Sequence, residues 1–268
     1  MTTFAEKPPL LDFHNLRVMR GQKIALDDFS LRIGADEHVA ILGPNGCGKS
    51  TLIKTITREC YPVVRDEVRE HSWMKLLGHE TWDVFKLRQH MGIVSNDLML
   101  SCTGEASGRD VVLSGFFSST AIWPNHTVEP EKIKLADAAL AELKISHLAE
   151  RPVCEMSSGE ARRVLIARSL VHKPGALLFD EPCNSLDLSA QQSVRQTMRS
   201  LASSGTAIIL VTHELADIVP EIGRVVLMDR GRIVADGRKE DILNVQRLAA
   251  LFGVGVELTR RDGHYYLW

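Results

Sequence analysis

The sequence predicts an α/β protein with a mainly parallel sheet, because short apolar runs alternate with longer segments of helical character. The first portion, 11–33, is instead predicted to form antiparallel strands around a turn near Gly21. With 268 residues, 44% of them hydrophobic, the chain is long enough to bury a full core. The runs predicted as buried strands are 38–42, 91–95, 176–180, 207–212 and 224–228.

The region 98–172 has a different pattern, which predicts a mostly helical subdomain inserted into the sheet domain. Pro130 suits the first turn of a helix, because its missing N–H has no partner there in any case. A second helix is expected within 159–175, where Pro174 and Gly175 end it. Apolar residues near helical spacing follow Pro130 at Ile133, Leu140 and Leu143.

Composition excludes several classes of protein. A net charge of −2 argues against a dominant nucleic-acid surface, and the arginine pairs 162–163 and 260–261 are expected on solvated faces. The five cysteines include no C-x-x-C pair, which favours reduced thiols in a cytosolic protein over disulfides or a zinc site. No secretory signal is predicted, and the apolar runs are far shorter than the roughly 18 residues of a membrane span. Any membrane role is therefore expected to depend on a partner.

The strongest local motif is GPNGCGKST, which matches G-x-x-x-x-G-K-[ST] between a predicted strand and a helix. Its glycines would let backbone N–H groups turn toward phosphate oxygens, aided by the helix dipole. Lys49 would reach the β- and γ-phosphates and the Ser50 hydroxyl would bind Mg²⁺. A glycine-rich turn that matches by chance is disfavoured by this strand-and-helix context. The residues expected to bind ATP are Gly43, Pro44, Asn45, Gly46, Cys47, Gly48, Lys49, Ser50 and Thr51.

Two adjacent carboxylates end the apolar run 176–180. Leaving them near a buried strand is costly unless something compensates their charge. A Mg²⁺ ion near Asp180 would do so, and Glu181 would stand where an attacking water needs a base. The alternative is a charged turn before Pro182, which the upstream phosphate-binding motif disfavours.

With these residues in place, the sequence resembles the nucleotide-binding domain of ABC-type ATPases over about residues 10–240. MSSGEARR at 156–163 resembles the LSGGQ signature of that family, and NSLD at 184–187 resembles its D-loop. His213, directly after a buried run, matches the family's switch histidine. The resemblance implies a P-loop NTPase fold with a RecA-like, mainly parallel sheet core, an antiparallel β subdomain and an inserted helical subdomain.

The same resemblance implies a single ABC ATPase domain over residues 1–268. The nucleotide-binding core with its β subdomain would comprise about 1–97 and 173–240. The helical subdomain that carries the signature would comprise about 98–172, and a short C-terminal extension 241–268.

In this family two such domains pair head to tail through ATP, so the P-loop of one copy would face the signature of the other. The signature helix, expected to begin near Glu160, would present its N-terminus to the γ-phosphate. Glu181, His213 and Lys49 are the predicted catalytic residues, with His213 contacting the γ-phosphate and orienting the water. Asp187 would link the two sites. The signature residues assigned to ATP binding are Ser157, Ser158, Gly159 and Glu160.

Two positions depart from the family pattern. Arg20 occupies the place of the usual aromatic residue, and its guanidinium is expected to stack on adenine. Asn96 occupies the place of the usual glutamine, with the same carboxamide one methylene shorter. Asn96 is expected to face Mg²⁺ and the water, with Ser50 and Asp180 as the other metal ligands, and Asp97 is expected to face solvent. The alternative for Asn96 is an ordinary turn at the end of a strand.

The resemblance implies an ATP-hydrolysing subunit, with ATP and Mg²⁺ as cofactors, that drives a separate membrane permease. Import of a metal, an oxyanion or a siderophore is expected, and the chain would lie at the inner face of the membrane. The tail 247–268 resembles siderophore- and vitamin-importer ATPases, whereas 75–95 and 110–119 resemble a molybdenum-transport or photorepair-type branch. The alternative is a soluble, non-transport ABC ATPase that regulates a protein or nucleic-acid partner. Direct nucleic-acid binding by the chain itself is not expected.

An aromatic group at Phe116, Phe117 and Trp123 has two interpretations. It could form a docking face for a partner helix, because aromatic residues are enriched at the cores of interfaces. The favoured interpretation is the small core of the helical subdomain itself.

Overall fold

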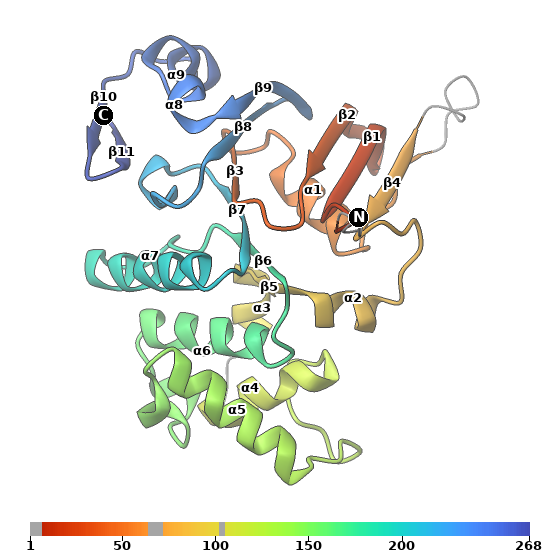
Figure 1. Ribbon diagram of the computed structural model, residues 1–268, viewed down its shortest axis with the longest axis vertical. Helices are drawn as coiled ribbons and strands as arrows, with labels where there is room; N and C mark the ends of the chain where they lie inside the picture. Colours follow the sequence, from red (N-terminus) through yellow and green to blue (C-terminus); the bar gives the residue numbers. More distant parts are fainter. Residues whose placement is uncertain (1–6, 64–71, 102–104) are drawn as a thin grey trace, which may run out of the picture. The chain divides into compact units, whose positions relative to one another are not determined.

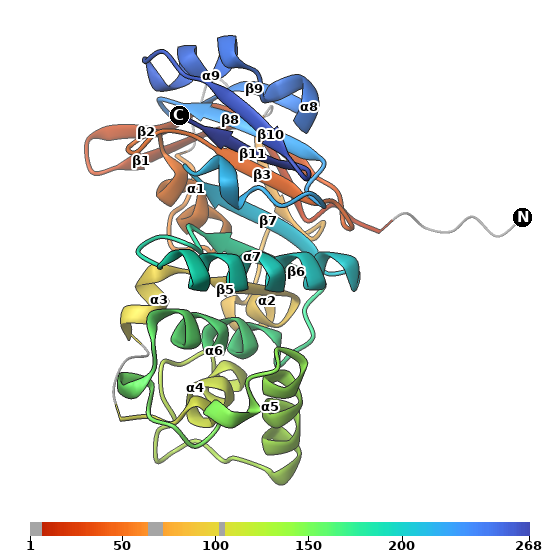
Figure 2. The ribbon, with the colours of Figure 1, turned by 90° about the vertical axis from the view of Figure 1, so that its left-hand side faces the viewer.

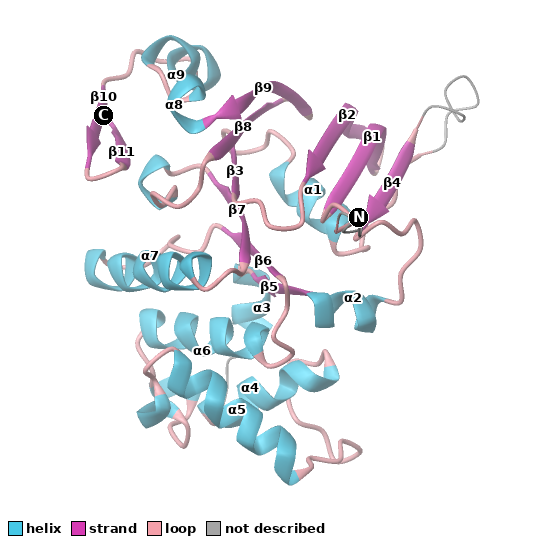
Figure 3. Cartoon of the chain, viewed as in Figure 1, coloured by secondary structure: helices cyan, strands magenta, loops and turns pink. Residues whose placement is uncertain are grey.

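The computed structural model describes residues 7–63, 72–101 and 105–268, which divide into two compact units (Figure 1). Unit 1 comprises Met1–Val84 and Ala207–Trp268, and unit 2 comprises Phe85–Thr206. Unit 1 holds most of the strands, whereas unit 2 is largely helical (Figure 3).

Unit 1 contains the predicted antiparallel sheet, in the order β2–β1–β4. β1 (Leu11–Arg20) and β2 (Lys23–Ile33) join at a tight turn where Gly21 has a φ of +61°. That left-handed conformation explains the glycine at this position. β4 (Trp73–Leu76) pairs with the beginning of β1 and was not predicted, because its four residues are too few to show a clear period.

A second sheet of unit 1 contains the parallel pairs. β3 (Val39–Leu42) lies between β7 (Ala207–Thr212) and β8 (Arg224–Asp229) and runs parallel to both. β3 and β7 are buried along their whole length, as their unbroken apolar runs predict. β9 (Arg232–Arg238) adds an antiparallel edge through a two-residue turn. Its alternation of exposed and half-buried residues gives no apolar run, so the sequence did not reveal it.

Helices and a hairpin complete unit 1. α1 (Lys49–Ile56) follows β3, and the short η5 (Leu215–Asp217) follows β7. α8 (Lys239–Ile242) and α9 (Val245–Phe252) come after β9. Near the end of the chain, β10 (Leu258–Arg261) and β11 (His264–Leu267) form an antiparallel hairpin.

The described strands of unit 2 are β5 (Met91–Val94) and β6 (Ala176–Asp180), which pair in parallel and were both predicted from the sequence. α2 (Val84–His90) precedes β5, and α3 (Asn96–Ser101) follows it. Gly92 permits close packing in this unit, because a Cβ there would lie 2.6 Å from the Ser169 carbonyl oxygen.

Four longer helices make up much of the rest of the described part of unit 2. α4 (Gly108–Ser114), α5 (Pro130–Glu142) and α6 (Ser158–Leu170) pack on one another, and α7 (Leu188–Ser203) packs on α6 (Figure 2). Pro130 starts α5 as predicted. α6 begins at Ser158, two residues earlier than expected, because Ser157 caps it. In the described part of unit 2, single-turn 3₁₀ segments connect these helices: η2 (Gly115–Phe117), η3 (Ser146–Leu148) and η4 (Val153–Glu155).

Two side-chain expectations in unit 2, for Ile133 and Trp123, need correction. Ile133 is exposed at the first turn of α5, whose buried face is formed by Ala136, Ala139 and Leu140. Phe117 stacks on His126 and Phe116 meets the edge of the His172 ring, as expected for a local core. Trp123 does not join them, because 54% of it is exposed.

Arg162, expected on a solvated face, is only 2% exposed and is among the largest fully buried side chains of the described chain. Arg260 and Arg261 are exposed as predicted. The helical periodicity of α6 could have indicated that Arg162 is buried, because Arg162 shares a face with Leu165 and Ile166, three and four residues further on.

Two further expectations concern cysteines and membrane spans. Cys47, Cys60, Cys154 and Cys183 are free thiols, and Cys102 lies outside the described residues. Within the described part of the chain, no helix is both long and apolar enough to cross a membrane.

Gly92→Ala is expected to lower the free energy of unfolding by about 1–3 kcal/mol, the usual cost of overpacking. The added methyl group would meet the Ser169 carbonyl oxygen and, at 2.5 Å, a methyl group of Leu177. Urea denaturation monitored by circular dichroism measures the change. Gly175→Ala is the matched control, because no atom lies within 4 Å of its added Cβ. Equal stability of the two variants would contradict the close packing.

Candidate nucleotide-binding site

The loop between β3 and α1 follows a backbone path that requires glycine. Gly46 and Gly48 have φ angles of +81° and +113°, in the left-handed region that other residues rarely adopt. At Gly43 the constraint is space, because a Cβ would lie 2.4 Å from the Met228 carbonyl oxygen and 2.6 Å from the Cys47 sulfur. The glycine spacing in the sequence therefore corresponds to turns and close packing within unit 1.

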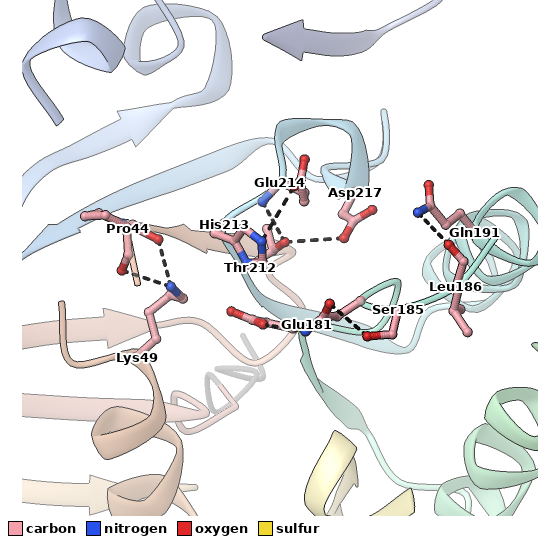
Figure 4. Close-up of polar contacts among 12 residues, drawn as sticks. Pro44, Lys49, Glu181, Ser185, Leu186, Gln191, Thr212, His213, Glu214 and Asp217 are labelled. Carbon is pink, nitrogen blue, oxygen red and sulfur yellow. Dashed lines mark hydrogen bonds and ion pairs between the residues drawn. The ribbon is translucent and has the colours of Figure 1, made fainter. Parts of the chain in front are cut away.

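A buried cation lies at this loop. Lys49 is 6% exposed, and its Nζ donates hydrogen bonds to the carbonyl oxygens of Gly43 at 2.7 Å and Pro44 at 3.1 Å (Figure 4). α1 begins at Lys49, and its N-cap residue Gly48 offers no side chain to the first-turn N–H groups. These donors, the helix dipole and the ammonium group together form a setting suited to phosphate oxygens.

The neighbouring side chains of the loop differ in exposure. Ser50 is exposed, whereas Thr51 is 3% exposed, so Ser50 is the hydroxyl better placed for a metal ion. Asn45 is also exposed. Cys47 is buried, and burial raises the pKa of its thiol, so Cys47 contributes packing and backbone groups rather than a reactive thiolate.

His213 lies at the same edge of the unit 1 sheet as the phosphate-binding loop. Leu42 of β3 pairs with Thr212 of β7, so Gly43 and His213 each follow one member of that pair. The half-buried His213 has its Nε2 3.6 Å from a carboxylate oxygen of Glu214 (Figure 4).

Buried hydrogen bonds of Thr212 stabilise the turn that carries His213. The buried Thr212 hydroxyl donates to Asp217 at 3.3 Å and accepts from the Glu214 backbone N–H at 3.0 Å. Both Thr212 and Asp217 are 1% exposed. This buried bonding fixes the backbone on either side of His213 and so restricts where its imidazole can point.

In unit 2, parallel pairing also gathers the polar residues at one edge. Val94 of β5 pairs with Phe179 of β6, so Asn96 and Glu181 each lie two residues beyond that pair. Asp180 is the last residue of β6. Glu181 has a φ of +45°, a conformation that costs a non-glycine residue of order 1–3 kcal/mol. Asn184 holds this turn, since its backbone N–H donates to the Glu181 carbonyl at 3.1 Å and its Nδ2 to the carboxylate at 3.3 Å.

Asn96 is the first residue of α3 rather than part of an ordinary turn. Its Oδ1 accepts a hydrogen bond from Nη2 of the buried Arg162 on α6. Asp97 is exposed, in agreement with its expected solvent-facing position. Arg162 is the residue of this region that sequence reasoning missed.

The signature residues form the N-terminus of α6. Ser157 is the N-cap: its hydroxyl accepts from the Glu160 N–H at 3.3 Å, and the Glu160 carboxylate accepts from the Ser157 N–H at 2.8 Å. That backbone hydrogen bond lowers the pKa of Glu160. Ser157 and Ser158 are exposed, whereas the Glu160 carboxylate is turned back to complete the cap. Gly159 is buried, and a Cβ there would lie 2.6 Å from the Ala190 Cβ of α7.

Asp187 has a local structural role. It is the N-cap of α7, and its Oδ1 accepts from the Ala190 N–H at 2.8 Å. The turn before it is bonded by Gln191, whose side chain donates to the Leu186 carbonyl at 3.0 Å, and by Ser185, which donates to Asn184 (Figure 4). Communication between two sites through Asp187 remains a prediction.

Arg20 ends β1 and is exposed, with Lys23 as its partner across the hairpin. Phe13, the aromatic residue earlier on β1, is 2% exposed within the core and therefore offers no face to a base. The exposed guanidinium of Arg20 has the planar shape that stacking on adenine requires.

Ser50 of unit 1 offers a hydroxyl oxygen, and Asp180 and Asn96 of unit 2 offer carboxylate and carboxamide oxygens, which are ligand types that Mg²⁺ accepts. Their assignment to one Mg²⁺ ion stays a prediction. Among the described residues, no group of three or more His, Cys, Asp or Glu side chains could hold a metal ion. Such sites often use one or two protein oxygens with substrate phosphates, and the ion would neutralise charge that develops on them.

The chain is similar to known proteins over most of its length. The family model described as ABC transporter matches residues 26–184. The hemin import ATP-binding protein HmuV of Bradyrhizobium diazoefficiens is 30% identical over 96% of this chain and 94% of its own length.

Solved structures match over most of the chain. cbiO1 of Clostridium perfringens, part of the ABC transporter complex cbiONQ, has a TM-score of 0.74 and 26% identity, covering 92% of this chain and 94% of its own. The ADP conformation of MJ1267, an ATP-binding cassette of an ABC transporter, has a TM-score of 0.77 and 24% identity, covering 91% and 97%. The second likeness supports the fold, a P-loop α/β cassette.

Glu181→Gln is expected to bind ATP but to hydrolyse it about 10²–10⁴-fold more slowly, because a carboxamide cannot accept the proton of the attacking water. Glutamine tolerates the same backbone turn and preserves the side chain's length. Phosphate release and nucleotide binding are measured on the same preparation. Glu142→Gln, an exposed change at the end of α5, is the control. Undiminished turnover in Glu181→Gln would remove Glu181 from the catalytic role.

Arg20→Ala is expected to weaken ATP binding about 2- to 30-fold, the range of a cation–π contact between exposed and desolvated limits. Binding is measured by titration with a fluorescent ATP analogue that is modified on the ribose. Lys23→Ala removes the cation opposite Arg20 on the same hairpin and serves as the control. If Arg20→Ala binds ATP as tightly as the parent protein, the stacking assignment is wrong.

Proposed function

Because this chain belongs to the ABC transporter family and is an ATP-binding subunit that hydrolyses ATP, we propose that it drives import of a metal-containing compound through a separate membrane permease. The substrate class proposed is a metal chelate, such as an iron porphyrin. The chain would act at the inner face of the membrane, bound to that permease.

The observation that carries the proposal is the near end-to-end match to a hemin import ATP-binding protein, over 96% of this chain and 94% of that protein. A match of that extent includes α9, which follows β9. The relatives do not single out the molybdenum-transport branch that two internal segments resemble, so the metal-chelate class is the better supported one.

We further propose that ATP is bound between two copies arranged head to tail. Lys49 and Ser50 of one copy would contact the phosphates and the metal, together with Asp180. The α6 N-terminus of the second copy would face the γ-phosphate. The exposed Ser157 and Ser158 support this arrangement, because an unburied helix N-terminus is free to meet an anion. A two-fold arrangement uses each surface twice, and ATP completes both sites.

Within that site, Glu181 would act as the base for the attacking water and His213 would orient that water and contact the γ-phosphate. Asn96 and Asp180 emerge at one edge of the β5–β6 pair, which supports their assignment to the metal and the water. The emergence of His213 beside the phosphate-binding loop supports its assignment to the γ-phosphate.

The test is uptake of a metal chelate by vesicles that contain the chain and its candidate permease, the multi-span protein recovered with it from gently solubilised membranes. Hemin uptake is expected with Mg²⁺·ATP and not with ADP, and Glu181→Gln should abolish it without releasing the chain from the vesicles. Full ATPase activity with no membrane partner and no uptake would contradict the transport role. That result would favour a soluble ABC regulator.

A further inference from the structure

The guanidinium group of Arg162 on α6 is buried and has few hydrogen-bond partners among the described residues. Arg162 is 2% exposed, and its Nη2 donates to Oδ1 of Asn96. Its Nε and Nη1 are also buried, and neither has a hydrogen-bond partner among the described residues. Burial lowers the pKa of Arg162, while the nearby Cys183 and Asp180 act in the opposite direction.

Packing alone does not account for this residue. An apolar side chain of similar volume would fill the same space without leaving charged N–H groups unbonded, which is unfavourable for a buried ion. Within the proposed site, Asn96 accepts a hydrogen bond from Arg162, and Asp180 lies close enough to act on the charge of Arg162. Asn96 and Arg162 both belong to unit 2, so their contact lies within one compact unit.

The contact uses the one atom of Asn96 that could bind a metal ion. A carboxamide offers its oxygen to cations, whereas its NH₂ group only donates hydrogen bonds. Mg²⁺ and the guanidinium would therefore share Oδ1, and two cations on one neutral oxygen repel each other. That repulsion is weakly screened, because Arg162 is buried.

We propose that Arg162 is a positioning residue that holds the Asn96 oxygen away from Mg²⁺, so that Asn96 reaches the metal only when this bond is broken. The proposal rests on the Mg²⁺·ATP site proposed above and is independent of any transport partner. Arg162 lies one helical turn after Ser158, the first residue of α6. A second copy that engages the α6 N-terminus would thus act on the helix that carries Arg162.

The test is a double-mutant cycle on the full chain, with Mn²⁺ as the probe in the presence of a non-hydrolysable ATP analogue. Electron paramagnetic resonance gives the Mn²⁺ affinity of the parent protein, Asn96→Ala, Arg162→Gln and the double variant. Arg162→Gln is expected to tighten Mn²⁺ binding about tenfold, the effect of releasing one charge-assisted hydrogen bond. Asn96→Ala should change the affinity less than about twofold in the parent yet remove the whole gain in Arg162→Gln.

Additive effects of the two changes would overturn the proposal, as would a weaker Mn²⁺ affinity in folded Arg162→Gln. Arg163→Gln, one position along α6, is the matched control and should leave the affinity unaltered. If Arg162→Gln does not fold, Arg162→Met replaces it, because methionine fills the buried space without a charge. The single variant Asn96→Ala is a second test. If it alone lowers the Mn²⁺ affinity more than about fivefold, the Asn96 oxygen already binds the metal in the parent protein, and Arg162 does not hold it away.

Asp180→Asn distinguishes a failure of the proposed metal site from a failure of the role of Arg162. If Asp180→Asn leaves nucleotide-dependent Mn²⁺ binding intact, the proposed metal site itself is wrong. If Asp180→Asn abolishes Mn²⁺ binding while the cycle shows no coupling, only the role of Arg162 fails.

Discussion

The pairing of buried parallel strands is the constraint on which the rest of the site depends. Side chains at the carboxyl ends of paired strands emerge at one edge, whatever their separation in the sequence. In unit 1 the pair Leu42–Thr212 brings the phosphate-binding loop and His213 to the same edge. In unit 2 the pair Val94–Phe179 does the same for Asn96 and for the carboxylates that end β6. The apolar interiors of these strands therefore do more than fill a core, because their register sets which polar groups can act together.

Buried cations show how differently the chain treats similar charges. The Nζ of Lys49 is bonded to two loop carbonyls, and Lys239, 3% exposed, donates to the carbonyls of Val219 and Pro220. Both ammonium groups thus recover the hydrogen bonds that burial removes. The guanidinium of Arg162 is as deeply buried but has two nitrogen atoms without partners in the described chain. The ammonium groups of Lys49 and Lys239 are therefore hydrogen-bonded by the backbone around them, whereas Arg162 donates a hydrogen bond to Asn96, a residue of the proposed site.

The strands with long apolar runs, and most of the motif residues, could be predicted because their signals are local. Short or alternating strands such as β4 and β9 could not, since their pattern differs little from that of a polar loop. The burial of Arg162 could be read only from the helical phase of α6, because the adjacent Arg163 made the pair resemble a solvated surface. The bond from Arg162 to Asn96 joins residues 66 positions apart and depends on how α6 packs, which no local pattern specifies. The role of Arg20 and the division into domains stay predictions.

The signature segment and the D-loop meet where Gly159 of α6 packs against Ala190 of α7, next to the N-cap of α7. Gly159 leaves room for Ala190, and the N–H of Ala190 is the group that Asp187 caps at the start of α7. Any larger residue at 159 would press on Ala190 and disturb that cap. Because Arg162 follows on the same helix, the α6 N-terminus is connected on one side to the D-loop and on the other to Asn96. A ligand at the α6 N-terminus would therefore act on a helix that contacts both, which gives a physical route by which a second copy's nucleotide could influence the carboxamide of Asn96.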